Sequence, residues 1–475
     1  MDINQIVDFL NGIIWSKALI ILCLGVGVYF TIVTRFLQIR HFTHMIGLMK
    51  EGKSSAKGIS SFQALTVSLS GRVGTGNIAG VATAIALGGP GAIFWMWLIA
   101  FLGAASAFIE ATLGQIYKQE KQGEYRGGPA YYIEKGLGIK WYAVLFAVVT
   151  IFAMGLFLPG VQSNSIAIGL EHAFGLPKYI TGLIVVSLLS LIIFGGIKRI
   201  GKVAEFVVPF MATAYIIVAV IIIGINIDKL PGVFSLIITS AFGSHSVFGG
   251  IIGSAIAWGV KRGIYSNEAG QGSAPHAAAA AEVSHPAKQG LVQAFSVYID
   301  TLFVCSATAF MILITGTFNV KGPAEGSFLA NNIPGVEIGP MYTQMAVESS
   351  FGYGAIFVAV SLFFFAFTTL MAYYYIAETN VAYLKRKNKD KWMITALRLM
   401  ILGSIFYGTL KTANLAWGLG DIGVGLMAWL NIIAIVLLRK PALKCLKDYE
   451  KKRKQGLDPV FNAKECDVEN AAFWT

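Results

Sequence analysis

Charged residues are scarce in this 475-residue chain. Asp, Glu, Lys and Arg make up 13% of it, against ~25% in soluble domains, while 56% of the residues are hydrophobic. With a mean hydropathy of +0.67, this composition excludes an ordinary soluble globular protein. The four cysteines form no CxxC pair, which argues against a disulfide scaffold or a zinc site. No GxxxxGK[ST] motif is present, which disfavours an ATP-driven pump.

Long apolar runs dominate instead. A membrane helix needs about 20 mostly apolar residues to cross a ~30 Å hydrocarbon core. We therefore predict an all-α polytopic membrane protein with about eleven transmembrane helices, and Gly, at 53 residues, suits close helix packing or helix breaks. The predicted spans are 14–34, 62–87, 91–117, 141–170, 179–197, 203–226, 247–281, 290–317, 353–378, 393–410 and 421–438.

The basic residues indicate how these spans are oriented. With the N-terminus outside, the loops on the inner side and the tail from 439 hold 28 of the 37 Lys and Arg residues. Only Lys17, Lys178, Lys229, Lys321 and Lys411 then lie outside. The positive-inside rule therefore predicts an N-out, C-in protein, and the +12 formal charge is no sign of nucleic-acid binding.

The span 62–87 should be broken in its middle. Ser70-Gly71-Arg72-Val73-Gly74-Thr75-Gly76-Asn77 brings three glycines and a cation to a depth where a lipid-facing helix stays apolar. Each Gly costs up to ~1 kcal/mol relative to Ala, and a central Arg costs about 2.5–3.5 kcal/mol or more. Broken backbone persists at this depth only inside protein or beside a wet cavity. For any single glycine, close packing against a neighbouring helix is the simpler alternative to a break.

The span 247–281 repeats this anomaly. Lys261, Arg262 and a glycine-rich stretch up to Pro275 interrupt an apolar segment. The two breaks lie five spans apart, as in transporters built from two inverted five-helix repeats with one extra helix at the N-terminus. We divide the chain accordingly into an extra helix and inner loop (1–61), a first repeat (62–226), a second repeat (247–438) and a basic cytoplasmic tail (439–475).

Three motifs carry a family resemblance: Gly74-Thr75-Gly76-Asn77-Ile78-Ala79-Gly80, Gly88-Gly89-Pro90-Gly91, and Ser266-Asn267-Glu268-Ala269-Gly270 with Gly272-Ser273-Ala274-Pro275. In this order they resemble the sodium:alanine (alanine or glycine:cation) symporter family, over almost the whole chain. The resemblance implies the amino acid-polyamine-organocation superfamily, the LeuT-like 5+5 inverted-repeat fold, and import of alanine or glycine with Na⁺ across a prokaryotic cell membrane.

The resemblance also implies site residues. The amides of Thr75 and Gly76, with the Thr75 hydroxyl, are expected to bind the substrate carboxylate, and Gln162 to hydrogen-bond the substrate. Asn77 is expected to orient the break or to contribute to a cation site. Unwound backbone over 263–267 should supply carbonyls for the ammonium group. The substrate-binding set is thus Thr75, Gly76, Asn77, Gln162, Gly263, Ser266 and Asn267.

Sodium is the implied coupling ion. The resemblance places the hydroxyls of Thr368 and Thr369 against the first break, where carbonyls of Ser70 and Val73 complete an oxygen site. Taken alone, a Thr in a membrane helix more commonly bonds the carbonyl one turn earlier in its own helix. No protein partner is indicated beyond the amino-acid substrate and the lipid bilayer.

Several alternatives stay open at this point. Arg72 and Glu268 could pair across the two breaks, or they could snorkel or cap backbone groups. Proton coupling is the main rival to sodium, and a multispan membrane enzyme or a channel is a more distant one. Four acidic residues in or near spans are candidate proton relays: Glu110, Glu205, Asp300 and Glu378. The simpler explanation is that most of them lie near span ends, where they are solvated or paired.

Overall fold

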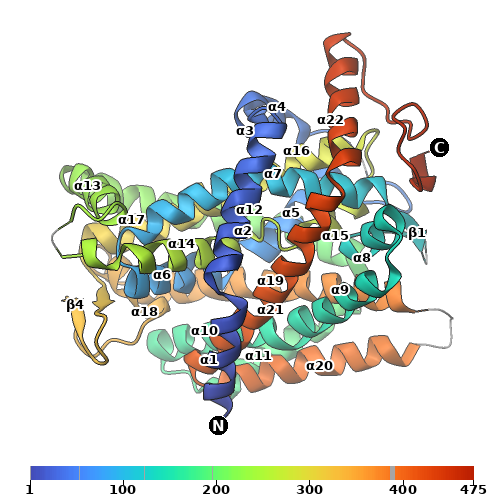
Figure 1. The fold of residues 1–475 in the computed structure, drawn as a ribbon. Helices are drawn as coiled ribbons and strands as arrows, with labels where there is room; N and C mark the ends of the chain where they lie inside the picture. Colours follow the sequence, from blue (N-terminus) through green and yellow to red (C-terminus); the bar gives the residue numbers. More distant parts are fainter. Residues whose placement is uncertain are drawn as a thin grey trace.

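A computed structural model of the chain describes residues 2–52, 54–121, 123–194, 196–245, 247–385 and 391–474. These residues form a helical bundle with two short antiparallel hairpins (Figure 1). The first half contains α1 (Ile3–Ile14), α2 (Lys17–Val33), α3 (Leu37–Arg40), α4 (Phe42–Leu48), α5 (Ser61–Arg72), η1 (Gly76–Gly80), α6 (Val81–Gly88), α7 (Ala92–Ile116), β1 (Gln119–Lys121), β2 (Glu124–Arg126), α8 (Pro129–Tyr132), η2 (Ile133–Leu137), α9 (Lys140–Phe152), η3 (Ala153–Phe157), α10 (Leu158–Phe174), α11 (Lys178–Ile193) and α12 (Gly196–Ile225).

The second half is also mostly helical. It contains η4 (Ile227–Lys229), α13 (Leu230–Ala241), η5 (Gly249–Ile251), α14 (Ile252–Asn267), α15 (Ala274–Ala280), α16 (Pro286–Val297), η6 (Tyr298–Cys305), α17 (Ser306–Thr315), β3 (Asn319–Lys321), β4 (Phe328–Asn331), α18 (Pro340–Glu348), α19 (Gly354–Leu384), α20 (Lys391–Leu410), α21 (Ala413–Leu437), α22 (Arg439–Lys454) and η7 (Ala472–Trp474).

The structure is that of a polytopic membrane protein. Within the described residues, seven helices are long and apolar enough to cross a bilayer, and α1 with α2, bent by 41°, makes an eighth if the pair counts as one span. The seven are Ala92–Ile116, Lys140–Phe174, Gly196–Ile225, Pro286–Thr315, Gly354–Leu384, Trp392–Leu410 and Ala413–Leu437.

The predicted count of about eleven differs from this for identifiable reasons. Each predicted range does contain helix, but 62–87 and 247–281 are interrupted and α11 has only 16 residues. The interruptions follow from glycines and polar groups, as the sequence predicts. The length criterion therefore fails where the chain is broken, and both predicted breaks are present.

The connections gather at two ends of the molecule. Figure 1 shows α13, α18 and β4 at one end, while α8 and β1 lie at the other. The pair α1–α2 runs beside α21, to which α1 is tied by the Asn11 side-chain amide donating to the Gly418 carbonyl at 2.9 Å. Loops that the charge pattern assigns to the same side of the membrane thus lie together.

The two broken spans lie inside the bundle. The half-helix α5 packs against α12 and α19, whereas α14 packs against α6 and α7. Every described residue from Ala64 to Ala82 is buried. Helices on the periphery, such as α20, instead expose large apolar side chains, Trp392 and Leu399 among them. This distribution suits a lipid-facing shell around an interior that holds the polar breaks.

Candidate functional site

The first break begins where α5 ends at Arg72. Val73 leaves the helix at φ −77° and ψ 85°, and the Gly74 amide donates to the side-chain oxygen Oδ1 of Asn77 at 2.8 Å. An unbroken helix would instead direct that amide to the Ser70 carbonyl. The Asn77 side chain therefore replaces a helical hydrogen bond and releases the Ser70 carbonyl for another partner.

That partner is a hydroxyl on α19. Thr369 Oγ1 lies 2.8 Å from the Ser70 carbonyl oxygen and 2.9 Å from the carbonyl oxygen of Phe365 in its own helix. Thr368 behaves differently, because its hydroxyl donates to Phe365 at 3.0 Å and faces the Met211 sulfur at 3.9 Å. Of the two predicted hydroxyls, only that of Thr369 makes a hydrogen bond to the break.

The predicted substrate residues on the other side of the break also meet. The Thr75 amide donates to Gln162 Oε1 at 3.1 Å, and the Gln162 amide group lies 3.4 Å from the Tyr373 hydroxyl. Thr75 is buried, and its Oγ1 has no hydrogen-bond partner among the described residues. Thr75 and Gln162 thus place a backbone donor, a side-chain amide and an unused hydroxyl together inside the bundle.

Glycine is required here by close approach. A Cβ on Gly74 would collide with Thr369 Oγ1 and come within 3.1 Å of Gln162 Oε1. A Cβ on Gly76 would lie 3.2 Å from the Ser266 Cα and 3.3 Å from the Tyr265 ring. The break consequently contacts α10 and α19 on one side and α14 on the other.

The second break lies later than the sequence analysis placed it. Helix α14 is continuous to Asn267, so the expected unwinding over 263–267 is wrong. The chain instead leaves the helix at Glu268 (φ 54°), with Gly270 (φ 82°) and Gly272 (φ 87°) also in the left-handed region. Those two positions suit glycine, which reaches positive φ without strain. Gly263 faces α7, where an added Cβ would collide with Ile99.

One aspartate connects the two broken spans. Asp300 Oδ1, on the π-helical turn η6, accepts hydrogen bonds from Asn77 Nδ2 at 2.6 Å and from Ser266 Oγ at 3.0 Å. Its Oδ2 accepts from the Thr301 hydroxyl at 2.7 Å, which in turn lies 3.3 Å from the Asn267 amide nitrogen. Asp300 is fully buried. The alternative that it lies solvated near a span end is therefore wrong.

A second buried carboxylate holds the backbone of the second break. Glu110 on α7 accepts the Gly270 amide at 3.3 Å and the Gly272 amide at 3.1 Å. Asn431 Nδ2 donates to Glu110 at 2.8 Å and to the Gly270 carbonyl at 2.9 Å. The sequence marks Glu110 and Asp300 only as acids within apolar spans. It does not indicate their partners, because Gly270 lies 160 residues from Glu110 and Asn77 lies 223 residues from Asp300.

The other acidic candidates bond nearer the periphery. Glu378 lies 3.7 Å from Arg126, and Glu205 accepts from the Gln63 amide at 2.9 Å. Glu378 and Glu205 therefore fit the simpler explanation, which is pairing with a neighbouring polar or basic side chain.

Arg72 does not pair with Glu268. Its Nη1 donates to the Gln293 carbonyl at 3.1 Å and to the Ser296 hydroxyl, while Glu268 accepts from Ser273 Oγ at 2.6 Å. Across the described ranges, no carboxylate lies within ion-pair distance of the Arg72 guanidinium. Both charges are buried beside the two breaks, each held by neutral groups.

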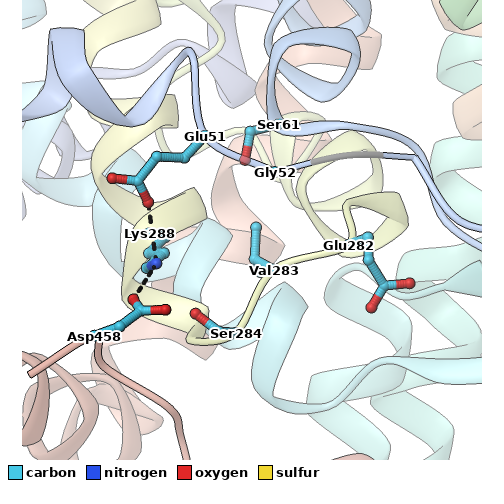
Figure 2. Close-up of a pocket in the computed structure, with 8 residues that line it drawn as sticks. All are labelled: Glu51, Gly52, Ser61, Glu282, Val283, Ser284, Lys288 and Asp458. Carbon is cyan, nitrogen blue, oxygen red and sulfur yellow. Dashed lines mark hydrogen bonds and ion pairs between the residues drawn. The ribbon is translucent and has the colours of Figure 1, made fainter.

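A separate cavity of about 660 Å³ lies where the segment before α5, the loop before α16 and the segment after α22 meet (Figure 2). Lys288 stands at its wall, with Nζ 3.0 Å from Glu51 Oε2 and 2.9 Å from Asp458 Oδ1. None of the predicted site residues lines this cavity. Lys288 pairs with two of the three carboxylates that line the cavity, Glu51 and Asp458, so the cavity is a junction of loops held by ion pairs.

Most of the predicted residues therefore converge on one region. Around the first break lie Ser70, Val73, Thr75, Gly76, Asn77, Gln162 and Thr369, and Ser266 and Asn267 join through Asp300 and Thr301. Gly263 points to α7 and Thr368 to its own helix. Oxygen ligands suit a hard cation, and an opened helix can supply them as carbonyls. The residues present thus fit both a small zwitterion and a sodium ion.

Comparison with known proteins decides the family. The family model described as the sodium:alanine symporter family matches residues 1–463. The chain belongs to the sodium:alanine symporter family. It is accordingly a multi-pass membrane transporter, and the enzyme alternative is set aside.

Two relatives and one solved structure extend this result. YrbD of Bacillus subtilis is 65% identical over 98% of this chain and 96% of its own length. The sodium/proton-dependent alanine carrier protein of Bacillus sp. strain PS3 is 56% identical over 90% of this chain and 97% of its own length. The crystal structure of a mutant manganese transporter of Eremococcus coleocola shares the fold, with a TM-score of 0.51 and 13% identity over 82% of this chain and 87% of that one.

Proposed function

We propose that this symporter imports alanine, glycine or another small neutral amino acid together with Na⁺. The observation that carries the proposal is the opened backbone at Val73–Thr75, which lies against a hydroxyl of α19 and an amide of α10. Discontinuous helices supply both an anion-binding amide end and cation-binding carbonyls. The PS3 relative, named as a sodium/proton-dependent alanine carrier, supports the same substrate and ion.

The sodium ion would be held at the first break. The Ser70 carbonyl and the Thr369 hydroxyl are already adjacent, at 2.8 Å, and Val73 lies at the helix end beside them. The Thr368 hydroxyl would join them on turning from Phe365, which makes Thr369 the stronger of the two hydroxyl ligands. When bound, Na⁺ would join α19 to the broken span and so make the geometry of the substrate site depend on the ion.

The substrate would lie next to the ion. Its carboxylate would accept from the Thr75 and Gly76 amides and from the unused Thr75 hydroxyl, at the N-terminal end of η1–α6 where the helix dipole favours an anion. Gln162 would turn from the Thr75 amide to the substrate. Ser266 and Asn267 would close the region from the second broken span. Because even a Cβ on Gly76 would lie 3.2 Å from the Ser266 Cα, we expect a substrate with a small side chain.

The finer architecture is part of the proposal. We infer two inverted five-helix repeats, 62–226 and 247–438, after one extra helix, with the N-terminus outside and the basic tail inside. The matching breaks of the two broken spans support this division, as does the shared fold with a membrane transporter. Alternating access would then rock the broken helices against the rest of the bundle. One Na⁺ entering down ~100 mV supplies about 2.3 kcal/mol for accumulation.

Proton coupling is the second candidate, favoured by the buried acids. Glu110 and Asp300 hold the two breaks without a cation partner in the described part of the chain. Protonating either acid would cost a hydrogen-bond acceptor at a break. The relative's name includes both ions, so protons would act together with sodium or replace it.

Uptake of labelled alanine into proteoliposomes tests the proposal. An inward Na⁺ gradient should drive accumulation that an equal K⁺ gradient does not. An imposed proton gradient with Na⁺ absent separates the two coupling ions. Failure to bind or accumulate alanine under every gradient would overturn the substrate assignment.

A further inference from the structure

A large vestibule lies on the side of the bundle that holds α1 and β3. Its volume is about 650 Å³, and its wall is shared by α1, α6, α14 and α21. The wall carries three cations, Lys261, Arg262 and Lys321, and two carboxylates, Asp8 and Asp421. This charge balance favours an anionic group in the cavity.

The charged centre of this vestibule is deeply buried. Arg262 is 1% exposed and Asp421 is 3% exposed. Arg262 Nη2 and Lys261 Nζ each lie 2.7 Å from the same oxygen, Asp421 Oδ2. Two positive charges therefore share one negative charge in a setting where bare charges are costly.

Both partners of the Arg262–Asp421 pair keep unused atoms. Within the described residues, Arg262 Nε and Nη1 and Asp421 Oδ1 have no hydrogen-bond partner. A buried donor or acceptor left unpaired costs about 1–3 kcal/mol. A donor set and an acceptor side by side complement the carboxylate and the ammonium group of one α-amino acid.

Arg262 also lies close to the first break. The Arg262 guanidinium is 4.6 Å from the Trp417 ring centroid, and that ring is tilted by 41° against Tyr265, with 5.0 Å between the ring centroids. A Cβ on Gly80 would lie 3.6 Å from Trp417, 3.9 Å from the Thr75 carbonyl oxygen and 4.0 Å from Arg262. Arg262 and the two rings thus separate the vestibule from Thr75.

We propose that Arg262 and Asp421 form an outer binding site for a zwitterionic amino acid, which the substrate occupies before it passes Trp417 and Tyr265 to the central site. This inference rests on the proposed function. Arg262 would take the carboxylate and Asp421 the ammonium group, and the Trp417 face would contact a small side chain. Because the Ser70–Thr369 pair lies at the other site, binding at the outer site would need no sodium.

Equilibrium binding of labelled alanine to the purified full-length protein tests the inference. The unmodified protein should bind two alanines per chain, one of them without Na⁺. Asp421→Asn and Arg262→Gln should remove only the Na⁺-independent binding, and should raise the external KM for uptake about tenfold or more while kcat stays within about twofold. Lys321→Gln is the matched control: it removes a cation of the same wall outside the pair and should leave two sites.

Competition on the unmodified protein keeps the inference testable if a variant does not fold. Propionate lacks the ammonium group and ethylamine lacks the carboxylate, so each should displace alanine from the outer site less well than glycine does. Propionate competing as well as glycine would show a plain anion site and overturn the assignment. One Na⁺-dependent site in a protein that still transports alanine would also overturn it, whereas absent transport and binding would instead refute the proposed function.

Discussion

Removing the Thr369 hydroxyl should weaken the sodium dependence of transport. In Thr369→Ala the buried Ser70 carbonyl loses its partner at 2.8 Å, and Na⁺ loses a proposed ligand. A buried ion left without one of its oxygen partners loses about 1–3 kcal/mol, and this loss weakens Na⁺ binding. A free-energy loss of this size corresponds to a rise of about 5–150-fold in the Na⁺ concentration that gives half-maximal uptake.

Uptake of labelled alanine in proteoliposomes, measured against Na⁺ concentration at saturating alanine, gives this value directly. Thr369→Ser keeps the hydroxyl and should remain within about threefold of the unmodified protein. Thr368→Ala, on the same helix, should give a smaller shift than Thr369→Ala, since its hydroxyl donates to Phe365 and must turn before it can reach the ion. Unchanged Na⁺ dependence in Thr369→Ala, or an equal shift in Thr368→Ala, would refute the placement of the ion.

Four further outcomes are expected. Gln162→Ala removes the acceptor of the Thr75 amide and should raise the alanine KM about tenfold with unchanged Na⁺ half-saturation; an unaltered KM would exclude Gln162 from the substrate site. Glu110→Gln leaves one of two backbone amides unpaired, so kcat and Tm should both fall, and loss of neither would contradict its positioning role. Gly263→Ala places a methyl group against α7 and should lower Tm while the alanine KM stays unchanged. A change in KM without a change in Tm would show that Gly263 does belong to the substrate site. Burial lowers the pKa of His44 from 6.5 to about 4, so its stabilising contribution is complete above pH 6.5 and is lost as the pH falls toward 4. Hydrogen exchange over α22, which His44 contacts, should rise across that range in the unmodified protein but not in His44→Gln.

Sequence motifs located the first break within the stretch Ser70–Asn77, for a physical reason. Gly74, Thr75 and Gly76 are consecutive, and the groups that open the helix, Asn77 among them, lie within four residues. Local chemistry of that kind can be read without a tertiary structure. The family resemblance gives Thr368 and Thr369 together, and only the contact of Thr369 with Ser70 distinguishes the two.

The second break shows where the sequence was insufficient. Charged residues and glycines extend from Gly259 to Gly272, and any part of that stretch could have opened. The structure places the opening at 268–273, because Glu110 and Asn431, both distant in sequence, hold the backbone there.

The sequence by itself determined the membrane class, the positions of the helical segments and the existence of two breaks, since hydropathy, glycine and charge act over short ranges. Only the tertiary structure decided which polar groups share a site. Asp300 joins the two broken spans, and Arg262 meets Asp421 across 159 residues. A buried charge is stable only beside partners that the folded chain brings to it, and those partners leave no local signal.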